Sequence, residues 1–429
     1  MERSKPVGIC IDDGKRQVVN VITWEQRKLG EVVEKVTTKN NDTQYIETFT
    51  NSAELGIMSQ REYFDHDVSN IENISGYYIV ENDAFVYNPR ISTSAPVGPI
   101  NRNKLGRTGV MSPLYTVFKV NGIDSEYLEW YFKSTGWHSF MKFNGDSGAR
   151  SDRFSIKDSV FFEMPIPTPD IDEQEKIGEY FSSLDHLITL HQRKCDEMKK
   201  MKKFMLQKMF PKNGQKNPEI RFDGFTDDWE QRKFKDVFDG LQNNTFSRAD
   251  LNYESGAVKN VHYGDVLIKF GDFIDVSKDE LPFITDESQT TKYNSSFLQD
   301  GDIIIADTAE DSTVGKCSEI VGFQGVKLLS GLHTIPCRPK EKYAPKFMGY
   351  YINSDAYHKQ LIPLMQGIKV TSISKSALQE TDMILPKSFE EQAQIGEYFS
   401  NIDHLITLHQ RKVENLKNLK KYMLQNMFV

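Results

Sequence analysis

The chain has 429 residues, of which 38% are hydrophobic and 27% charged, and its formal net charge at pH 7 is -8. This composition is globular, and the length suggests two or three domains, which excludes a disordered chain or a single small disulfide-stapled fold. A net negative charge repels DNA and counts against nucleic acid as a partner unless charge is segregated along the chain.

Cysteine usage and targeting signals indicate a reducing compartment. Cys10, Cys195, Cys317 and Cys337 are widely separated, so neither a disulfide framework nor a CxxC zinc site is present in the sequence. The N-terminal stretch is charged, and no segment approaches the 18 consecutive apolar residues of a membrane span. We therefore expect a cytoplasmic protein without membrane contact.

The predicted elements form two similar series along the chain. Short apolar runs bounded by turn residues predict strands at 75–80, 84–89, 114–120 and 160–167, and then at 264–270, 301–307, 332–339 and 382–386. Helical patterns at 124–134 and 344–354 are interleaved with them. Each series therefore predicts an α+β domain with a mixed or antiparallel sheet.

A heptad pattern follows each series and predicts a long helix. The first seam is Ile177, Phe181, Leu184, Ile188, His191, Cys195 and Met198, and the second is Ile395, Phe399, Ile402, Ile406, His409, Val413 and Leu416. Lys202 and Lys420 interrupt the two seams further on. A rod of this kind is roughly 57 Å long at 1.5 Å per residue. We expect the two rods to pack together, with His191 and His409 as polar seam residues that fix the register.

The two series are copies of one another. Residues 173–210 recur at 391–428 with 26 of 38 positions identical, and WEQRK at 24–28 recurs at 229–233. We therefore divide the chain into an atypical N-terminal segment (1–23), a first domain (24–168), a first helix (169–211), a linker (212–228), a second domain (229–387) and a second helix (388–429). The duplication predicts a pseudo-twofold relation between antiparallel helices, with a domain at each end.

Catalytic motifs are incomplete wherever we sought them. The segment STVGKCS around Lys316 lacks the first glycine and the Ser/Thr of a phosphate-binding loop. YNPR at 87–90 lacks the second proline of an adenine methyltransferase clamp. PDIDEQEK at 169–176 resembles a nuclease motif but fits a helix cap better, because its second copy reads PKSFEEQA. We expect no catalytic residue in this chain.

Two histidine pairs also fail as metal ligands. His186 and His191 recur as His404 and His409 at a spacing of five residues. A helical zinc pair needs a spacing of four, which places both rings on one face. We therefore expect no metal site.

Polar segments in the two domains are candidates for DNA contact, against the alternative that they are solvated loops. Arginine reads guanine and asparagine reads adenine through paired hydrogen bonds, whereas Ser and Lys suit phosphates. Residues 82–153 and 312–387 are also net basic, although the whole chain is acidic. The candidates are Arg90, Asn101, Arg102, Asn103, Lys104, Arg107 and Ser112 in the first domain, and Thr308, Ser312, Thr313, Lys316, Gln366, Lys369, Thr371 and Ser372 in the second.

The repeated helix motif and the domain motifs resemble the specificity subunit of Type I restriction-modification enzymes. The residues that carry the resemblance are GEYFS, IDHLITLHQRK and LQ.MF in the helices, NPEIRFDGFTDDWEQRKF at the second domain, and YNPRIS, GVMSPLY, GDIIIAD and LLSGLHTI in the domains. It covers nearly the whole chain from Trp24 onward. Residues 1–23 depart from the lead-in that the second copy shows at 217–228.

The resemblance implies a non-catalytic subunit that reads an asymmetric, bipartite site in double-stranded DNA, one half per domain. It implies two modification methyltransferase partners, which use S-adenosylmethionine, and restriction subunits, which use ATP and Mg²⁺; no cofactor is implied for this chain. The helices would set the spacer between half-sites, at most about 17 base pairs for such a rod.

Invariant helix residues off the seam are candidate methyltransferase contacts: Tyr180, Gln192, Arg193, Tyr398, Gln410 and Arg411. Solvent exposure alone explains each of them singly. Two rival functions remain at this point. One is a protein-docking scaffold without DNA specificity, which the net charge favours, and the other is a stand-alone nuclease.

Overall fold

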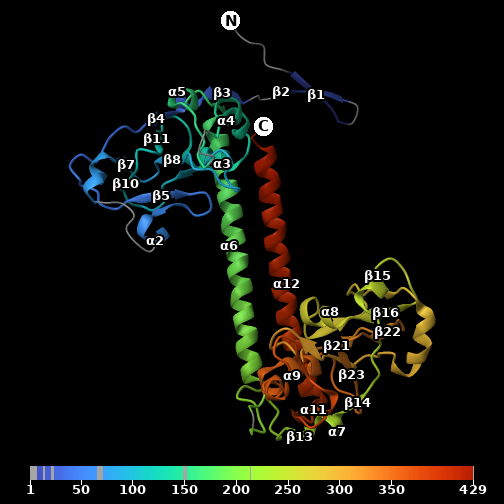
Figure 1. The fold of residues 1–429 in the computed structure, drawn as a ribbon. Helices are drawn as coiled ribbons and strands as arrows, with labels where there is room; N and C mark the ends of the chain where they lie inside the picture. The colour runs from blue at the N-terminus through green and yellow to red at the C-terminus, as the bar shows by residue number, and fades with distance from the viewer. Residues whose placement is uncertain are drawn as a thin grey trace. The chain divides into compact units, whose positions relative to one another are not determined.

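The computed structural model describes residues 7–12, 15–20, 24–64, 71–147, 152–212 and 214–428. They fall into two compact units, unit 1 (Met1–His191 with Lys412–Val429) and unit 2 (Gln192–Arg411), shown in Figure 1. Each unit holds one α+β domain, so the predicted fold class and internal repeat are confirmed. Of the predicted N-terminal segment, the backbone of an antiparallel hairpin is described, β1 (Val7–Asp12) with β2 (Lys15–Asn20). The rest of residues 1–23 lies outside the described residues.

The unit 1 domain is built on a four-stranded antiparallel sheet in the order β4-β11-β8-β9. Its strands are β4 (Val33–Lys35), β11 (Thr116–Val120), β8 (Phe85–Tyr87) and β9 (Ile100–Arg102). Two further antiparallel pairs are β5 (Phe49–Ser52) with β6 (Gly56–Ser59), and β7 (Tyr78–Val80) with β10 (Gly109–Met111). The helices are α1 (Leu29–Val32), α2 (Gln60–Phe64), η1 (Ile71–Gly76), α3 (Ser125–Lys133), α4 (His138–Asn144) and α5 (Asp158–Phe161).

The unit 2 domain repeats this sheet and extends it. Its order is β14-β23-β19-β21-β17, and the first four strands correspond to the four of unit 1. They are β14 (Phe238–Gly240), β23 (Thr334–Pro339), β19 (Ile303–Ala306), β21 (Cys317–Val321) and β17 (Phe273–Asp275). A second sheet runs β15 (Leu251–Asn252), β18 (Phe283–Ile284), β16 (Val258–Val261), β22 (Lys327–Ser330). The pairs β16–β22 and β17–β21 are parallel, so the predicted mixed sheet is confirmed.

The repeated WEQRK sequence forms the same strand pair in both units. β3 (Glu25–Lys28) pairs with β12 (Pro165–Thr168), and β13 (Glu230–Lys233) pairs with β25 (Asp382–Leu385). Each pair precedes a long helix. The remaining elements of unit 2 are α7 (Phe234–Val237), η2 (Arg248–Asp250), α8 (Tyr263–Ile268), η3 (Glu287–Ser296), β20 (Thr308–Ala309), α9 (Phe347–Asn353), α10 (Asp355–His358), η4 (Ile362–Leu364), β24 (Thr371–Ser372) and α11 (Lys375–Gln379).

Two predicted strands differ from the structure. The run 264–270 forms helix α8, where His262 caps the first turn by accepting from the Gly264 amide. The first half of 160–167 ends helix α5, and only the second half forms a strand, β12. A short apolar run carries no helical or strand period of its own, so tertiary context decided both cases.

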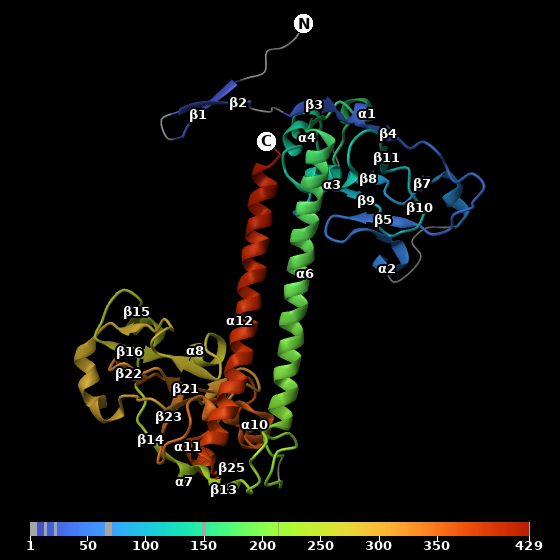
Figure 2. The ribbon, with the colours of Figure 1, turned by 180° about the vertical axis from the view of Figure 1, so that it is seen from behind.

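The predicted heptad seam is the buried stripe of the helices α6 (Ile171–Lys208) and α12 (Phe389–Asn426). In unit 1 the Phe181 ring, near the start of α6, stacks on Phe428, just beyond the end of α12, at 6.0 Å. In unit 2 the Phe210 ring, just beyond the end of α6, stacks on Phe399, near the start of α12, at 5.9 Å. Each unit therefore brings the start of one helix to the end of the other, as antiparallel packing requires, and both views show this (Figure 2).

The two lysines that interrupt the seams form matching ion pairs. In unit 2 Lys202 contacts Asp403 at 2.7 Å, and in unit 1 Lys420 contacts Asp185 at 2.5 Å. Both ammonium groups also lie over an aromatic ring of the domain, Tyr350 at 5.0 Å and Trp130 at 4.6 Å. Each lysine thus interrupts the apolar stripe of its own helix and contacts both the other long helix and the domain. No helix among the described residues is long and apolar enough to cross a membrane.

The segment predicted as a linker is docked on unit 2. Arg221 forms two hydrogen bonds to the carboxylate of Glu391, at 2.7 and 2.9 Å, and the Glu391 side chain is only 2% exposed. The indole of Trp229 donates to the same carboxylate at 3.2 Å. The Glu391 charge holds the pKa of Arg221 above its ordinary value, chiefly through this hydrogen bonding. Residues 217–229 therefore fasten the start of α12.

Replacement of Arg221 tests this fastening. Arg221→Ala leaves the Glu391 carboxylate buried without its cation, which costs about 3–5 kcal/mol. We expect the free energy of unfolding of unit 2, measured by urea denaturation, to fall by that amount. Arg193→Ala, which removes a 70% exposed guanidinium, is the matched control and should change stability by less than about 0.5 kcal/mol. Equal effects would show that Arg221 is a surface contact.

A buried carboxyl in β21 makes unit 2 sensitive to pH. Glu319 is 2% exposed, and burial raises its pKa to about 7, although the amides of Lys346 and Gly349 donate to it. A raised folded-state pKa contributes stability at low pH that is lost as the pH rises from the unfolded value through 7.

We therefore expect unit 2 to lose on the order of 3 kcal/mol of stability between pH 4.5 and 7.5 through this group. Denaturant unfolding of Glu319→Gln against the parent chain across that range measures it, because the variant lacks the titration. The difference in unfolding free energy between the two proteins should change with pH by that amount. A difference independent of pH would contradict the assignment.

Candidate nucleic-acid interface

In unit 1 a polar loop after the central strand β8 is paired with a second loop. Arg90 lies opposite Arg153 in an antiparallel bridge. The Ile91 amide donates to the Asp152 carbonyl at 3.0 Å, and the Phe154 amide donates to the Pro89 carbonyl at 2.7 Å. We call residues 88–92 with 152–155 the first loop pair. It borders a hollow of about 360 Å³ whose walls include Pro89 and Arg153.

The bridge places two like charges side by side. The two backbone hydrogen bonds are made by the residues on either side of Arg90 and Arg153, so these two arginines form a non-hydrogen-bonded pair. In such a pair the two side chains lie on the same face. Like charges directly opposite one another are destabilising. Within the described part of the chain neither guanidinium forms an ion pair, and both residues are exposed. An anionic or guanine-bearing ligand would relieve the repulsion.

Unit 2 repeats the arrangement after the corresponding strand, β19. β20 pairs with β24, so that Thr308 lies opposite Ser372 and Ala309 opposite Thr371. Gln366 and Ser372 exchange both backbone hydrogen bonds, at 2.8 and 2.9 Å, which closes a hairpin. We call residues 307–313 with 366–372 the second loop pair. The two separate polar segments predicted in the second domain are therefore brought together.

The tip of the second loop pair is exposed. Lys369, Gln366, Ser312 and Ser372 are all open to solvent. Ile368 between them is fully exposed, at 101%. Apolar tips of this kind contact thymine methyl groups or wedge between base steps. Sequence reasoning missed Ile368 and Arg153; an alignment of the two copies would have matched the sequence around Arg153 with residues 366–372.

Most first-domain candidates other than Arg90 are engaged within the protein. Asn103 is fully buried, and its amide donates to the carbonyls of Glu81 and Arg107. The Asn101 amide donates to the side chain of Asn51 at 2.7 Å. Both asparagines therefore have partners within the domain, and their assignment as base contacts stays a prediction.

The charged candidates beyond β9 also have protein partners. The Arg102 side chain is 7% exposed and lies 3.2 Å from Glu129, which also pairs with Lys104. Arg107 makes two 2.8 Å hydrogen bonds to Glu47. This bonding keeps the pKa of Glu47 below and that of Arg107 above the ordinary values.

Ser112 accepts from the Leu114 amide at 3.4 Å and shapes a turn. It lies beside Pro113, which lines the hollow that the first loop pair borders. Arg102, in contrast, pairs with Phe85 at the far end of β8.

Four second-domain candidates are likewise engaged within the protein. The Lys316 ammonium donates to the carbonyls of Leu267 and Phe270, and burial lowers its pKa; its assignment as a DNA contact stays a prediction. The hydroxyl of Thr308 donates to Asp307, and that of Thr313 to Asp311. Thr371 donates to the Ala309 carbonyl at 3.3 Å.

The candidate partner contacts lie on the helices with different exposure. Tyr180 is 38% exposed, whereas its counterpart Tyr398 lies 6.0 Å from the Phe222 ring of the docked segment. Gln192, Arg193, Gln410 and Arg411 are exposed. Arg193 lies 4.0 Å from Glu197 one turn along the helix. Among the described residues no three His, Cys, Asp or Glu side chains gather as metal ligands.

Comparison with known proteins shows the family to which the chain belongs. Residues 22–200 and 226–418 both match the Type I restriction modification DNA specificity domain. The Type I restriction enzyme MjaVIII specificity subunit of Methanocaldococcus jannaschii is 26% identical over 330 residues, covering 74% of this chain and 73% of that protein. The chain belongs to this family. It is a specificity subunit of a Type I restriction-modification system.

Solved structures of specificity subunits have the same fold. The S subunit of the Type I restriction-modification system from M. genitalium has a TM-score of 0.51 at 12% identity, over 96% of this chain and 98% of that one. A chain from a structure on complex assembly and conformational transition of the type I R-M system has a TM-score of 0.51 at 15% identity, over 94% and 97%.

Substitution of the arginine pair tests the first loop pair of this specificity subunit. Arg90→Ala or Arg153→Ala should each weaken specific DNA binding by about 1–3 kcal/mol and relax specificity at one half-site only. Fluorescence anisotropy with DNA variants in each half-site measures both effects. Arg27→Ala removes an arginine that is 33% exposed and lies outside the loop pair and outside the candidate set, so it should leave specificity unchanged. Equal losses in all three variants would show a general charge effect.

Proposed function

We propose that the specificity subunit reads one half of a bipartite DNA site with each loop pair. The observation that carries this proposal is the repetition of the loop pair after equivalent strands, β8 and β19, with different side chains. The first offers two arginines, which suit guanine or phosphate, and the second offers Gln366, Lys369 and hydroxyls, with Ile368 at its tip. Unlike readers imply an asymmetric target, in contrast to the palindromes bound by homodimers.

Two modification methyltransferases are the partners we assign to the repeated helix surfaces. Tyr180 on α6 recurs as Tyr398 on α12, and Gln192 with Arg193 recurs as Gln410 with Arg411. Identical surfaces suit two copies of one partner, although the Phe222 contact covers part of the Tyr398 side. Restriction subunits join through the methyltransferases. The helices, each 38 residues long, set the number of unread base pairs between the half-sites.

Chemistry is assigned to the partners rather than to this chain. The methyltransferases supply S-adenosylmethionine chemistry, and the restriction subunits use ATP and Mg²⁺. We assign no catalytic residue and no cofactor to the specificity subunit, and we place it in the cytoplasm. Its contribution is selection of the base to be modified, through the position at which the two loop pairs hold the duplex.

A protein-docking scaffold without DNA specificity is the alternative that the net charge of -8 favours. A scaffold would assemble with methyltransferases and show no preference among DNA sequences. The DNA proposal requires instead that local positive groups outweigh the overall field, such as Arg90 and Arg153, which form no ion pair with any described residue.

Methylation mapping of DNA from a host that expresses this chain with its methyltransferase tests the function. We expect modified adenines within one split, asymmetric sequence, and a gel shift on that sequence that weakens steeply with salt. A hybrid with the second loop pair replaced should alter one half of the sequence and leave the other intact. Assembly with the methyltransferase but no sequence preference would support the scaffold.

A further inference from the structure

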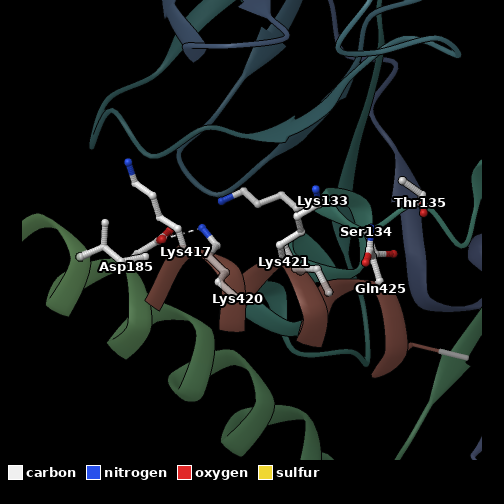
Figure 3. Close-up of a pocket in the computed structure, with 10 residues that line it drawn as sticks. Lys133, Ser134, Thr135, Asp185, Lys417, Lys420, Lys421 and Gln425 are labelled. Atoms are coloured by element: carbon white, nitrogen blue, oxygen red, sulfur yellow. Dashed lines mark hydrogen bonds and ion pairs between the residues drawn. The ribbon is translucent and has the colours of Figure 1, made fainter. Parts of the chain in front are cut away.

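A basic hollow lies in unit 1 where the domain meets both long helices. It has a volume of about 360 Å³. Figure 3 shows four lysines around it: Lys133 from the end of α3, and Lys417, Lys420 and Lys421 from α12. Asp185 is the one acidic residue of the described lining. The local charge is therefore +3 in a chain whose total is -8.

Unit 2 contains a twin of this hollow, of about 370 Å³. The seven lining residues that α6 and α12 supply to one hollow are identical in type to the seven they supply to the other. The domain residues differ, because Lys133 corresponds to Asn353 and Thr135 to Asp355, and Asp272 lines only the second hollow. The twin is thus a natural control in which the helices are kept and the domain wall is changed.

The changed wall neutralises the second hollow. Lys202 lies 2.8 Å from Asp272 and 2.7 Å from Asp403. Burial alone would lower the pKa of Lys202, but the two carboxylates outweigh it and raise the pKa. With Asp355 in the wall, three carboxylates face the three lysines of this hollow.

The first hollow keeps its positive charge. Among the described residues Asp185 is the carboxylate partner of Lys420, and Lys133 pairs with Glu129 outside the hollow. The ammonium groups of both lysines lie over the same ring, that of Trp130, at 4.0 and 4.6 Å. Lys417 and Lys421 are exposed and form no ion pair within the described part of the chain. Such a set of like charges favours an anion.

The hollow lies close to the element that carries the loop pair. In unit 2, Asp355 lines the hollow and begins the single-turn helix α10, whose last residue, His358, contacts the Ser312 carbonyl of the second loop pair at 3.1 Å. In unit 1, Thr135 lines the hollow and α4 begins three residues later, at His138. Just beyond α4, Asp146 exchanges both backbone hydrogen bonds with Ser155 of the first loop pair, at 2.7 and 3.1 Å. At 1.5 Å per residue, the four residues of α10 span about 6 Å and the seven residues of α4 about 10 Å.

We propose that the unit 1 hollow binds a backbone phosphate of the DNA beside the first half-site, and that its unit 2 twin does not. The inference rests on the proposed function and adds an asymmetry to it. Only the hollow of unit 1, where the domain meets the two long helices, contacts the DNA backbone. Lys417 and Lys421 supply the free ammonium groups, and Lys133 and Thr135 complete the wall. Phosphate contacts of this kind add affinity without reading sequence.

The double variant Lys417→Gln/Lys421→Gln tests the inference in the assembled methyltransferase complex. We expect the slope of log affinity against log salt to fall by about 1–2, and affinity near 0.1 M salt to fall about tenfold, with the recognised sequence unchanged. Lys199→Gln/Lys203→Gln changes the equivalent lysines of the twin and should leave the slope as in the parent complex. Circular dichroism and assembly with the methyltransferase check both variants.

A complementary variant adds the missing charge to the twin. Asn353→Lys/Asp355→Thr gives unit 2 the wall of unit 1 while keeping Asp272, and we expect it to raise the salt slope. Equal slopes in the parent and all three variants, or equal losses from both lysine pairs, would overturn the inference. Loss of methyltransferase assembly from the first variant alone would also overturn it, since the hollow would then be a protein interface.

Free phosphate compounds are the other source of the same chemistry. Titration of the full chain with inorganic phosphate and with ATP, followed by thermal shift, separates the two sources. One outcome would overturn the proposal: the chain binds ATP tightly, Lys417→Gln/Lys421→Gln abolishes that binding, and the DNA salt slope is unchanged. The ligand of the hollow would then be a nucleotide and not the DNA backbone. A parent complex without DNA affinity would instead refute the proposed function, so the two failures are distinguishable.

Discussion

Everything in this fold depends on the contact between the start of one long helix and the end of the other. An amphipathic helix of 38 residues leaves its apolar stripe in water unless a partner covers it. The same pair of contacts recurs in both units, a stacked pair of phenylalanines and a Lys–Asp ion pair that also reaches a domain ring. The lysine places a charge where an apolar residue would pack, so it specifies which residues may face one another.

The domains and the helices carry different kinds of constraint. The sheets keep the same strand order in both units, and the WEQRK strand pairs are equivalent, although most domain residues differ. A sheet core accepts many apolar combinations of similar volume. Side chains on the loop pairs contribute little to that core, so their chemistry can change without loss of the fold. This separation allows one architecture to present two unlike surfaces.

The sequence predicted best what depends on periodicity and worst what depends on tertiary partners. The heptad seam and both long helices follow from the spacing of apolar residues alone, and they agree with the structure. Nothing local distinguishes Asn103 from an exposed loop asparagine, yet it is fully buried and its amide lies within hydrogen-bond distance of three carbonyls, those of Val80, Glu81 and Arg107.

Lys316 is similar, since its partners Leu267 and Phe270 lie far back in the chain. The Arg90–Arg153 bridge was missed for the same reason, because it joins loops 63 residues apart. The role of a polar residue can therefore be assigned only when the fold shows which residues surround it.

The discontinuity of unit 1 has a consequence for the order in which the protein is made. Its core includes Leu416 and Phe428, which follow the whole of unit 2 in the chain. At about 5–20 residues per second of synthesis, residues 192–411 take roughly 10–45 s to leave the ribosome. Unit 2 is complete before the last strip of the unit 1 core exists. During that interval Phe181 can stack on Trp130 but lacks Phe428, so the nascent first domain exposes a hydrophobic edge that chaperones or neighbouring chains can reach.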